Sequence, residues 1–194
     1  MALQITGGYL KGRRLAAVKG RVRPTAAKVR EAIFNILGPA VAGARVLDLF
    51  AGTGALGIEA LSRGAREAVF VEEQAAAVTV LRRNLETLDL KDRTKVMPFP
   101  VQAALKKLAA QKERFGLAFL DPPYGRDLAR ATLNALEASG ILHPAAWIVA
   151  EHSRRDALPE VINRLHLQKV RRYGDTQVAF YICRENEERQ EIDG

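Results

Sequence analysis

The stretch Val46–Gly57, "VLDLFAGTGALG", predicts the fold of this 194-residue chain. It begins with apolar residues around one acid and runs directly into three glycines, the order expected of a buried strand, a tight turn and a helix. Gly52, Gly54 and Gly57 match the pattern G-x-G-x-x-G, whose glycines let the backbone approach a bound nucleotide. We therefore predict a strand at 46–50 within a Rossmann-like βαβ unit.

Short apolar runs alternate with helix-like stretches from this turn onward. Such alternation is typical of an α/β fold whose mainly parallel sheet is buried on both faces. The predicted strands are 45–50, 67–72, 94–99, 117–121 and 145–151, and the predicted helices are 54–63, 74–88, 101–110 and 127–139. Two further runs, 165–174 and 176–184, flank the turn signal Gly174-Asp175 and predict an antiparallel hairpin that closes the sheet.

The chain carries a net charge of +8, and the excess lies at its N-terminus. Residues 1–30 contain eight basic side chains and no acid, whereas the remainder has 22 basic and 22 acidic residues. A polyanion such as nucleic acid is the expected partner, because each phosphate contact releases condensed counterions. The alternative is a solvated charged tail. Since "LQITGGYLKGRRLAAV" alternates apolar residues with glycines, we expect a short β ribbon there, followed by a helix at 23–38 with Thr25 as its N-cap.

Several classes of protein and of site are not expected from the composition. The apolar stretches are too short to span a bilayer, and the N-terminus lacks the pattern of a secretory signal. One cysteine, Cys183, excludes an internal disulfide and fits a reducing compartment, so we expect a cytoplasmic protein. We also expect a monomer. His143, His152 and His166 have no metal-ligand spacing, and we expect no metal site.

An acid beside the glycine turn bears on the choice of cofactor. Asp48 precedes the turn, where a dinucleotide would place its pyrophosphate and where a carboxylate would be unfavourable. S-adenosylmethionine (AdoMet) has a sulfonium and an ammonium but no phosphate, and it suits this acid better. Glu72, at the end of the next strand, is placed to accept hydrogen bonds from ribose hydroxyls.

The stretch Leu117–Arg126, "LAFLDPPYGR", places Asp121, Pro122 and Tyr124 at the end of another strand. An exocyclic amine of a nucleobase is a poor nucleophile, and acceptors on its N–H groups would polarise it for attack on a methyl group. Asp121 offers one acceptor and the Pro122 carbonyl another, while Tyr124 offers a platform on which a base can stack. These three residues are the predicted catalytic set.

Together, "DLFAGTGALGIEALSRGA" and "LDPPYG" resemble the AdoMet-dependent amino-methyltransferases of nucleic acids. The preceding "ITGGYLKGRRL" and "RVRPTAAKVREAIFNIL" are similar to the N-terminal signature of one branch, the bacterial 16S rRNA (guanine-N2)-methyltransferases of RsmD type. This resemblance covers roughly residues 3–183. It implies methylation of the guanine N2 at position 966 of small-subunit RNA, either naked or within the 30S subunit or an assembly intermediate.

The resemblance also implies an architecture and a set of site residues. The fold would be a class I methyltransferase with a seven-stranded, mostly parallel sheet and an antiparallel final strand. The chain would divide into a basic arm (1–24), the methyltransferase domain (25–184) and a disordered tail (185–194). The residues expected to bind AdoMet are Asp48, Phe50, Gly52, Gly54, Glu72 and Gln102, and those expected to face RNA or shape the base pocket are Arg13, Arg14, Arg23, Thr25, Lys28 and Arg30.

Some alternatives remain open from the sequence. No acid lies between Lys95 and Glu113, so either Gln102 or the backbone around 101–103 would contact the adenine. Arg171, Arg172 and Tyr173 would either touch RNA or line a solvated edge. The rival functions are a DNA adenine-N6 methyltransferase, an NAD(P)-dependent oxidoreductase and a non-catalytic RNA-binding module.

Overall fold

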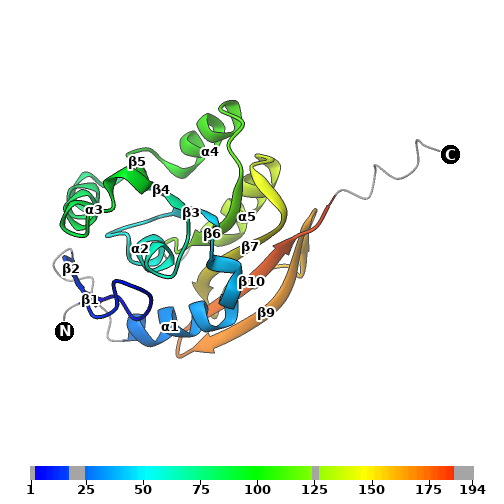
Figure 1. Cartoon of the computed structure of the whole chain (residues 1–194). Helices are drawn as coiled ribbons and strands as arrows, with labels where there is room; N and C mark the ends of the chain where they lie inside the picture. The colour runs from blue at the N-terminus through cyan, green and yellow to red at the C-terminus, as the bar shows by residue number, and fades with distance from the viewer. Residues whose placement is uncertain (1–2, 18–24, 124–126, 186–194) are drawn as a thin grey trace.

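The strand predicted around Val46 is β3 (Arg45–Leu49), an inner strand of an eight-stranded sheet in the computed structural model, which describes residues 3–17, 25–123 and 127–185. The strand order is β5-β4-β3-β6-β7-β10-β9-β8 (Figure 1). The other strands are β4 (Glu67–Val71), β5 (Thr94–Met97), β6 (Phe115–Leu120), β7 (Leu142–Ser153), β8 (Val161–Ile162), β9 (Leu165–Tyr173) and β10 (Thr176–Cys183).

The sheet has the predicted topology with one added strand. Strands β3 to β7 pair in parallel, and β10 pairs antiparallel with both β7 and β9, so the closing hairpin is confirmed. Seven of the eight strands are those predicted. The eighth, β8, has only two residues, too few for an alternating pattern to reveal, and it pairs with β9 at the edge.

Helices cover both faces of the sheet (Figure 1). The apolar sides of α1 (Thr25–Leu37), α2 (Ala55–Ser62) and α3 (Ala75–Thr87) form one core with side chains from one face of the strands. On the opposite face, α4 (Val101–Ala110) and α5 (Leu128–Ala138) form the second core. Short 3-10 turns lie at Gly38–Val41 and Lys91–Arg93. The predicted helices are thus confirmed, with ends within a few residues of those expected.

The N-terminal ribbon is part of the first core rather than a separate arm. Strands β1 (Leu3–Gln4) and β2 (Arg14–Leu15) pair antiparallel, as predicted. Ile5, Leu10 and Leu15 are buried against the helices of that face. The ribbon lies beside α2 and α3 in Figure 1. Its burial means that residues 3–17 contribute to the stability of the domain.

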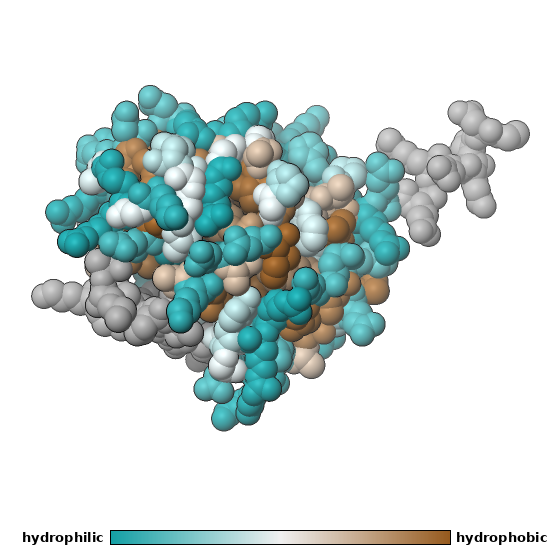
Figure 2. Space-filling model, turned by 60° about the horizontal axis from the view of Figure 1, so that its bottom comes forward, coloured by the Kyte–Doolittle hydropathy of each residue, from teal (hydrophilic) through white to brown (hydrophobic). Residues whose placement is uncertain are grey.

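The described surface is largely polar. Figure 2, in which the lower side of Figure 1 comes forward, shows mostly hydrophilic residues on this face, with hydrophobic residues gathered in a band near its middle. Within the described ranges, the exposed large hydrophobic residues are Tyr9, Phe99, Val161 and Val170. None of the helices in these ranges is long and apolar enough to cross a bilayer.

Candidate active site

Three predicted site residues lie in one row at the carboxyl edge of the sheet. Leu49 of β3 pairs in register with Val71 of β4 and with Leu120 of β6. The next residues along the three strands, Phe50, Glu72 and Asp121, therefore leave the sheet at the same level. Ligands of open α/β sheets bind at this edge, and the glycine turn lies between the two acids.

Asp48 of β3, two residues before Phe50, carries a buried carboxyl group. It is 2 % exposed, and its Oδ2 accepts a hydrogen bond from the Gly57 N–H at 2.9 Å. Burial, together with the charges of Asp121 and Glu72, raises the pKa of Asp48 to about 7, although the Gly57 hydrogen bond acts in the opposite direction. Three acids thus converge on one turn, and a cationic ligand there would favour their ionised forms.

Glu72 is held by the backbone that surrounds it. Its Oε2 accepts a hydrogen bond from the Gly52 N–H and its Oε1 one from the Gln74 N–H, each at 2.8 Å. Each oxygen keeps a further lone pair, so the carboxylate still has acceptor capacity for a ribose. Phe50, beside it, has a φ of +62°, an uncommon backbone conformation for a bulky residue that is found often at functional sites.

Two glycines of the turn serve different purposes. A Cβ on Gly57 would lie 2.3 Å from Cε1 of Phe70 and 3.1 Å from Oδ2 of Asp48, so this glycine lets α2 approach β3 and β4 closely. Gly52 has a φ of +56°, and a Cβ there would meet nothing within 4 Å. The backbone at Gly52 therefore borders open space, which matches its predicted place beside a cofactor.

The D-P-P segment lies directly past the end of β6. Asp121 is exposed and Pro122 is buried, so the acid lies at the surface of this edge while the proline after it restricts the backbone. Tyr124 lies outside the described residues, and its predicted stacking role stays a prediction. Gln102 is exposed in the first turn of α4, directly after the loop that follows β5, which leaves its predicted adenine contact open.

The predicted RNA-facing residues divide into three groups. Arg13, Arg14 and Lys28 are exposed. Arg13 donates to the carbonyl of Thr87 at 3.3 Å, at the end of α3, and one turn earlier Asn84 of the same helix donates to the carbonyl of Thr53 in the glycine turn at 2.9 Å. Arg23 and the side chain of Thr25 lie outside the described part.

The prediction that Arg30 faces RNA is corrected by its burial. Its side chain is 4 % exposed, its Nε lies 3.4 Å from Oε2 of Glu59, and its Nη2 donates to the carbonyl of Gln4. The periodicity that exposes Lys28 places Arg30 on the buried side of α1, where its charge is compensated inside the protein. Arg30 therefore joins α1 to α2 and to the ribbon.

Sequence reasoning missed the residue at the centre of this junction. The Glu59 carboxylate is fully buried and accepts hydrogen bonds from the backbone and hydroxyl of Thr6, at 2.8 and 2.7 Å, and from Arg63 Nε at 2.9 Å. Ser62 and Asn84 bind the ribbon backbone in the same way, at Leu10 and Ala16. A single acid within the apolar run "ALGIEALS" was the available signal.

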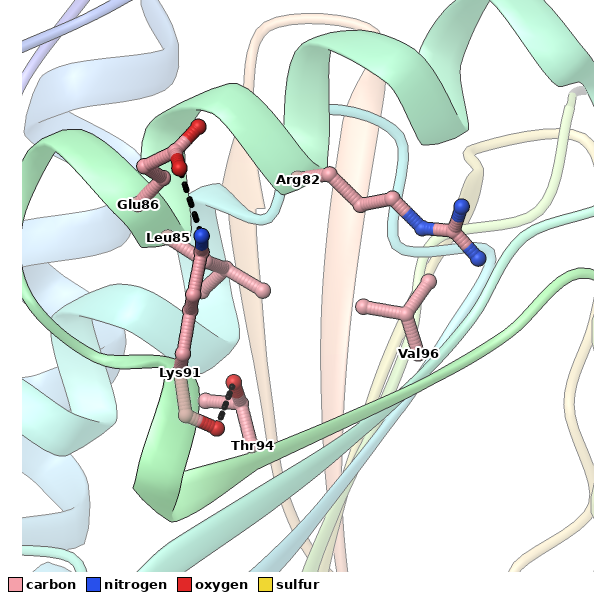
Figure 3. A pocket seen from close by; sticks show the side chains of 6 residues that line it. All are labelled: Arg82, Leu85, Glu86, Lys91, Thr94 and Val96. Carbon is pink, nitrogen blue, oxygen red and sulfur yellow. Dashed lines mark hydrogen bonds and ion pairs between the residues drawn. The ribbon is translucent and has the colours of Figure 1, made fainter.

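The groove shown in Figure 3 lies away from the carboxyl edge. Its lining residues come from the second half of α3, from the 3-10 turn at Lys91–Arg93 and from β5, and include an ion pair between Glu86 and Lys91. No described group of three or more His, Cys, Asp or Glu residues is arranged to hold a metal ion.

Known proteins resemble this chain over most of its length. Residues 3–182 match the family described as "Conserved hypothetical protein 95". The chain is 39 % identical to ribosomal RNA small subunit methyltransferase D of Escherichia coli (strain K12), over 87 % of this chain and 84 % of that protein. A solved Escherichia coli structure assigned as the methyltransferase yhhF is 36 % identical, with a TM-score of 0.85 over 96 % of this chain and all of that one.

A more distant structure shares the fold. It is a protein described as a methyltransferase and complexed with SAH, 15 % identical with a TM-score of 0.68, and the match covers 83 % of this chain and 50 % of that one. The class I methyltransferase fold predicted from the sequence is therefore confirmed.

Proposed function

The chain belongs to the family described as "Conserved hypothetical protein 95", the RsmD-type methyltransferases, and we propose that it transfers a methyl group from AdoMet to the N2 of a guanine in small-subunit rRNA. Guanine 966 is the first position to test, and the 30S subunit or an assembly intermediate is the substrate to offer first. The relative named small subunit methyltransferase D supports the rRNA substrate.

The observation that carries the proposal is the row of Glu72 and Asp121 on either side of an open glycine turn, with Asp48 buried beneath it. A dinucleotide would bring phosphates next to three carboxylates, which Coulomb repulsion disfavours. The arrangement thus favours methyl transfer over the rival hydride transfer.

Each carboxylate has a separate role in holding AdoMet. Glu72, fixed by the N–H groups of Gly52 and Gln74, accepts hydrogen bonds from the ribose hydroxyls. Asp48 and the backbone of Gly52 and Gly54 face the methionine portion, whose ammonium favours the ionised carboxylate. The exposed Gln102 lies on the adenine side. The SAH complex of the distant structure supports the choice of cofactor. When bound, AdoMet supplies a methyl group on a positively charged sulfur.

Asp121 and Pro122 prepare the amine for attack. The Asp121 carboxylate and the Pro122 carbonyl accept hydrogen bonds from the two N–H bonds of the guanine N2, which orients its lone pair outward. Pro122 has no N–H of its own to compete for these acceptors, and its burial holds the pair in place. The nitrogen becomes strongly acidic once methylated, so its proton passes to Asp121 or to water without a strongly shifted base.

Methylation is tested with labelled AdoMet and three substrates: 30S subunits, naked 16S rRNA and duplex DNA. We expect label in rRNA, on a guanine that mass spectrometry of nuclease fragments then locates. Label in DNA alone would show a DNA methyltransferase instead. Binding of NAD(P)H without binding of AdoMet would favour an oxidoreductase.

Asp121 is tested by the variant Asp121→Ala. We expect kcat to fall by about 10²-fold or more, because the amine loses its acceptor, while the Kd for AdoMet measured by calorimetry changes little. Glu73→Ala, which removes an exposed acid at the same edge, is the control and should keep its activity. Unchanged transfer by Asp121→Ala would refute the assigned role.

A further inference from the structure

Two arginines of β9 lie at the same edge of the sheet as Asp121, three strands away. The pairings Leu120 with Ala150, Ala150 with Ala179, and Ala179 with Val170 form one continuous row across β6, β7, β10 and β9. Strands β6, β7 and β9 run in the same direction, so Arg171 and Arg172 follow Val170 at the edge as Asp121 and Pro122 follow Leu120. Three strand spacings separate the two sites by about 14 Å.

Two more arginines meet them from the end of β7. The backbone N–H of Arg154 donates to the carbonyl of Asp175 at 3.0 Å, which joins the turn after β7 to the turn of the β9–β10 hairpin. Arg155 follows in the same turn. We call Arg154, Arg155, Arg171 and Arg172 the arginine ridge.

The four residues of the ridge are exposed, and they form no ion pair with the other residues that the structure describes. Arg172 Nε donates a hydrogen bond to the Gly174 carbonyl at 3.3 Å. Several other described arginines are neutralised: Arg45, Arg63 and Arg164 each pair with a glutamate. Asp156 and Asp175 belong to the same two turns, so the ridge retains an excess of positive charge.

The position of the ridge differs from that of two other arginines that were predicted to face RNA. Arg13 of the ribbon is bound to the end of α3, and Arg30 is buried. Arg171 and Arg172 stand on paired strands at the same edge of the sheet as Asp121, and this pairing restricts the motion of their backbone.

We propose that the arginine ridge binds backbone phosphates of the rRNA a few nucleotides from the target guanine. This inference rests on the proposed function. Exposed guanidinium groups bind phosphates through paired N–H groups and release counterions, whereas an apolar partner surface would leave their charges without a partner. The ridge thus contributes to the affinity for the RNA and to its position on the protein, and Asp121 binds the amine that is methylated.

The test compares two ridge variants with a matched control. The ridge variants are Arg171→Ala/Arg172→Ala and Arg154→Ala/Arg155→Ala. The control is Lys112→Ala/Arg114→Ala, which removes two exposed charges immediately before β6, at the opposite edge of the sheet. Each variant is assayed for KM and kcat on the rRNA substrate, for the Kd of AdoMet, and for thermal unfolding.

We expect each ridge variant to raise KM by about tenfold while kcat and the Kd of AdoMet stay within about twofold. The slope of log affinity against log salt should become shallower by about 1 to 2, because one or two phosphate contacts are lost. The control should leave KM and the slope unchanged. The variant Arg171→Lys/Arg172→Lys should recover the slope, since lysine retains the charge.

Three results would overturn the proposal. Unchanged KM in both ridge variants would make the ridge a solvated edge. Equal losses in ridge and control variants would show an effect of net charge alone. If the wild-type protein transfers no methyl group to rRNA, the proposed function fails. The ridge is then still tested by fluorescence anisotropy with 16S rRNA fragments, where equal binding by wild type and ridge variants would refute it.

Discussion

Asp48 couples the electrostatics of the site to pH. Its pKa stands at about 7 because the carboxyl group is buried beside two other acids. Binding a cation lowers that pKa, so AdoMet should release a proton as it binds below pH 7. We expect the Kd for AdoMet to rise by up to about tenfold per unit as pH falls from 7 to 5. Calorimetry across this range measures it, and an Asp48→Asn variant should bind weakly with a flat profile.

The same group makes a prediction for stability. Because the pKa of Asp48 is higher in the folded than in the unfolded chain, its contribution to the free energy of unfolding declines as pH rises from about 4 to 7. The loss is at most about 4 kcal/mol and is complete above pH 7. Asp48→Asn should therefore gain stability relative to wild type at pH 8 but not at pH 4 in urea titrations. An equal gain at both values would contradict the assignment.

Substitutions of two glycines in the turn should have different effects, one on packing and the other on ligand binding. Gly57→Ala places its Cβ against the Phe70 ring and should cost about 1–3 kcal/mol of stability. Gly52→Ala meets no atom but has to adopt a positive φ, which costs about 1–2 kcal/mol. It should also raise the Kd for AdoMet by about tenfold or more, since it fills the space of the ligand. Thermal melts and calorimetry test both, and wild-type AdoMet affinity in Gly52→Ala would contradict the site.

At the scale of elements, a buried ion pair connects α1, α2 and the ribbon. Removing Arg30 leaves the fully buried Glu59 with Arg63 as its remaining ionic partner. Arg30→Met should therefore lower the free energy of unfolding by about 3 kcal/mol. Lys28→Met, on the exposed side of the same helix, should change it little. An increase in the KM for rRNA without a loss of stability in Arg30→Met would restore the RNA-facing role predicted from the sequence.

Most elements were predictable because their patterns are local. The apolar runs of β3, β4 and β6 and the glycine turn follow from residues that are neighbours in the chain. By contrast, β8 has two residues and carries no periodicity, and it exists because Val161 and Ile162 find partners in β9. The orientation of Arg30 likewise depends on the position of α2, and this position cannot be predicted from the residues around Arg30.

For the whole molecule, the ribbon is a structural part of the domain. Deleting residues 1–17 would expose the surfaces that cover Ile5, Leu10 and Leu15 and would leave Glu59, Ser62 and Asn84 without partners. The apolar loss alone is about 5–9 kcal/mol, comparable with the whole stability of a typical domain. We expect the truncated chain to be unfolded at 37 °C by circular dichroism. A cooperative melt close to that of the full chain would contradict this.

The sequence by itself determined the alternation of strands and helices, the glycine turn with Asp48, the acid Glu72 and the D-P-P segment, because each arises within a few consecutive residues. The tertiary structure decided which of these groups meet. Strand register aligns Glu72 with Asp121, burial raises the pKa of Asp48, and packing turns Arg30 inward. It also brings Arg171 and Arg172 to the same edge of the sheet as Asp121, since register across a sheet joins residues that are far apart in the chain.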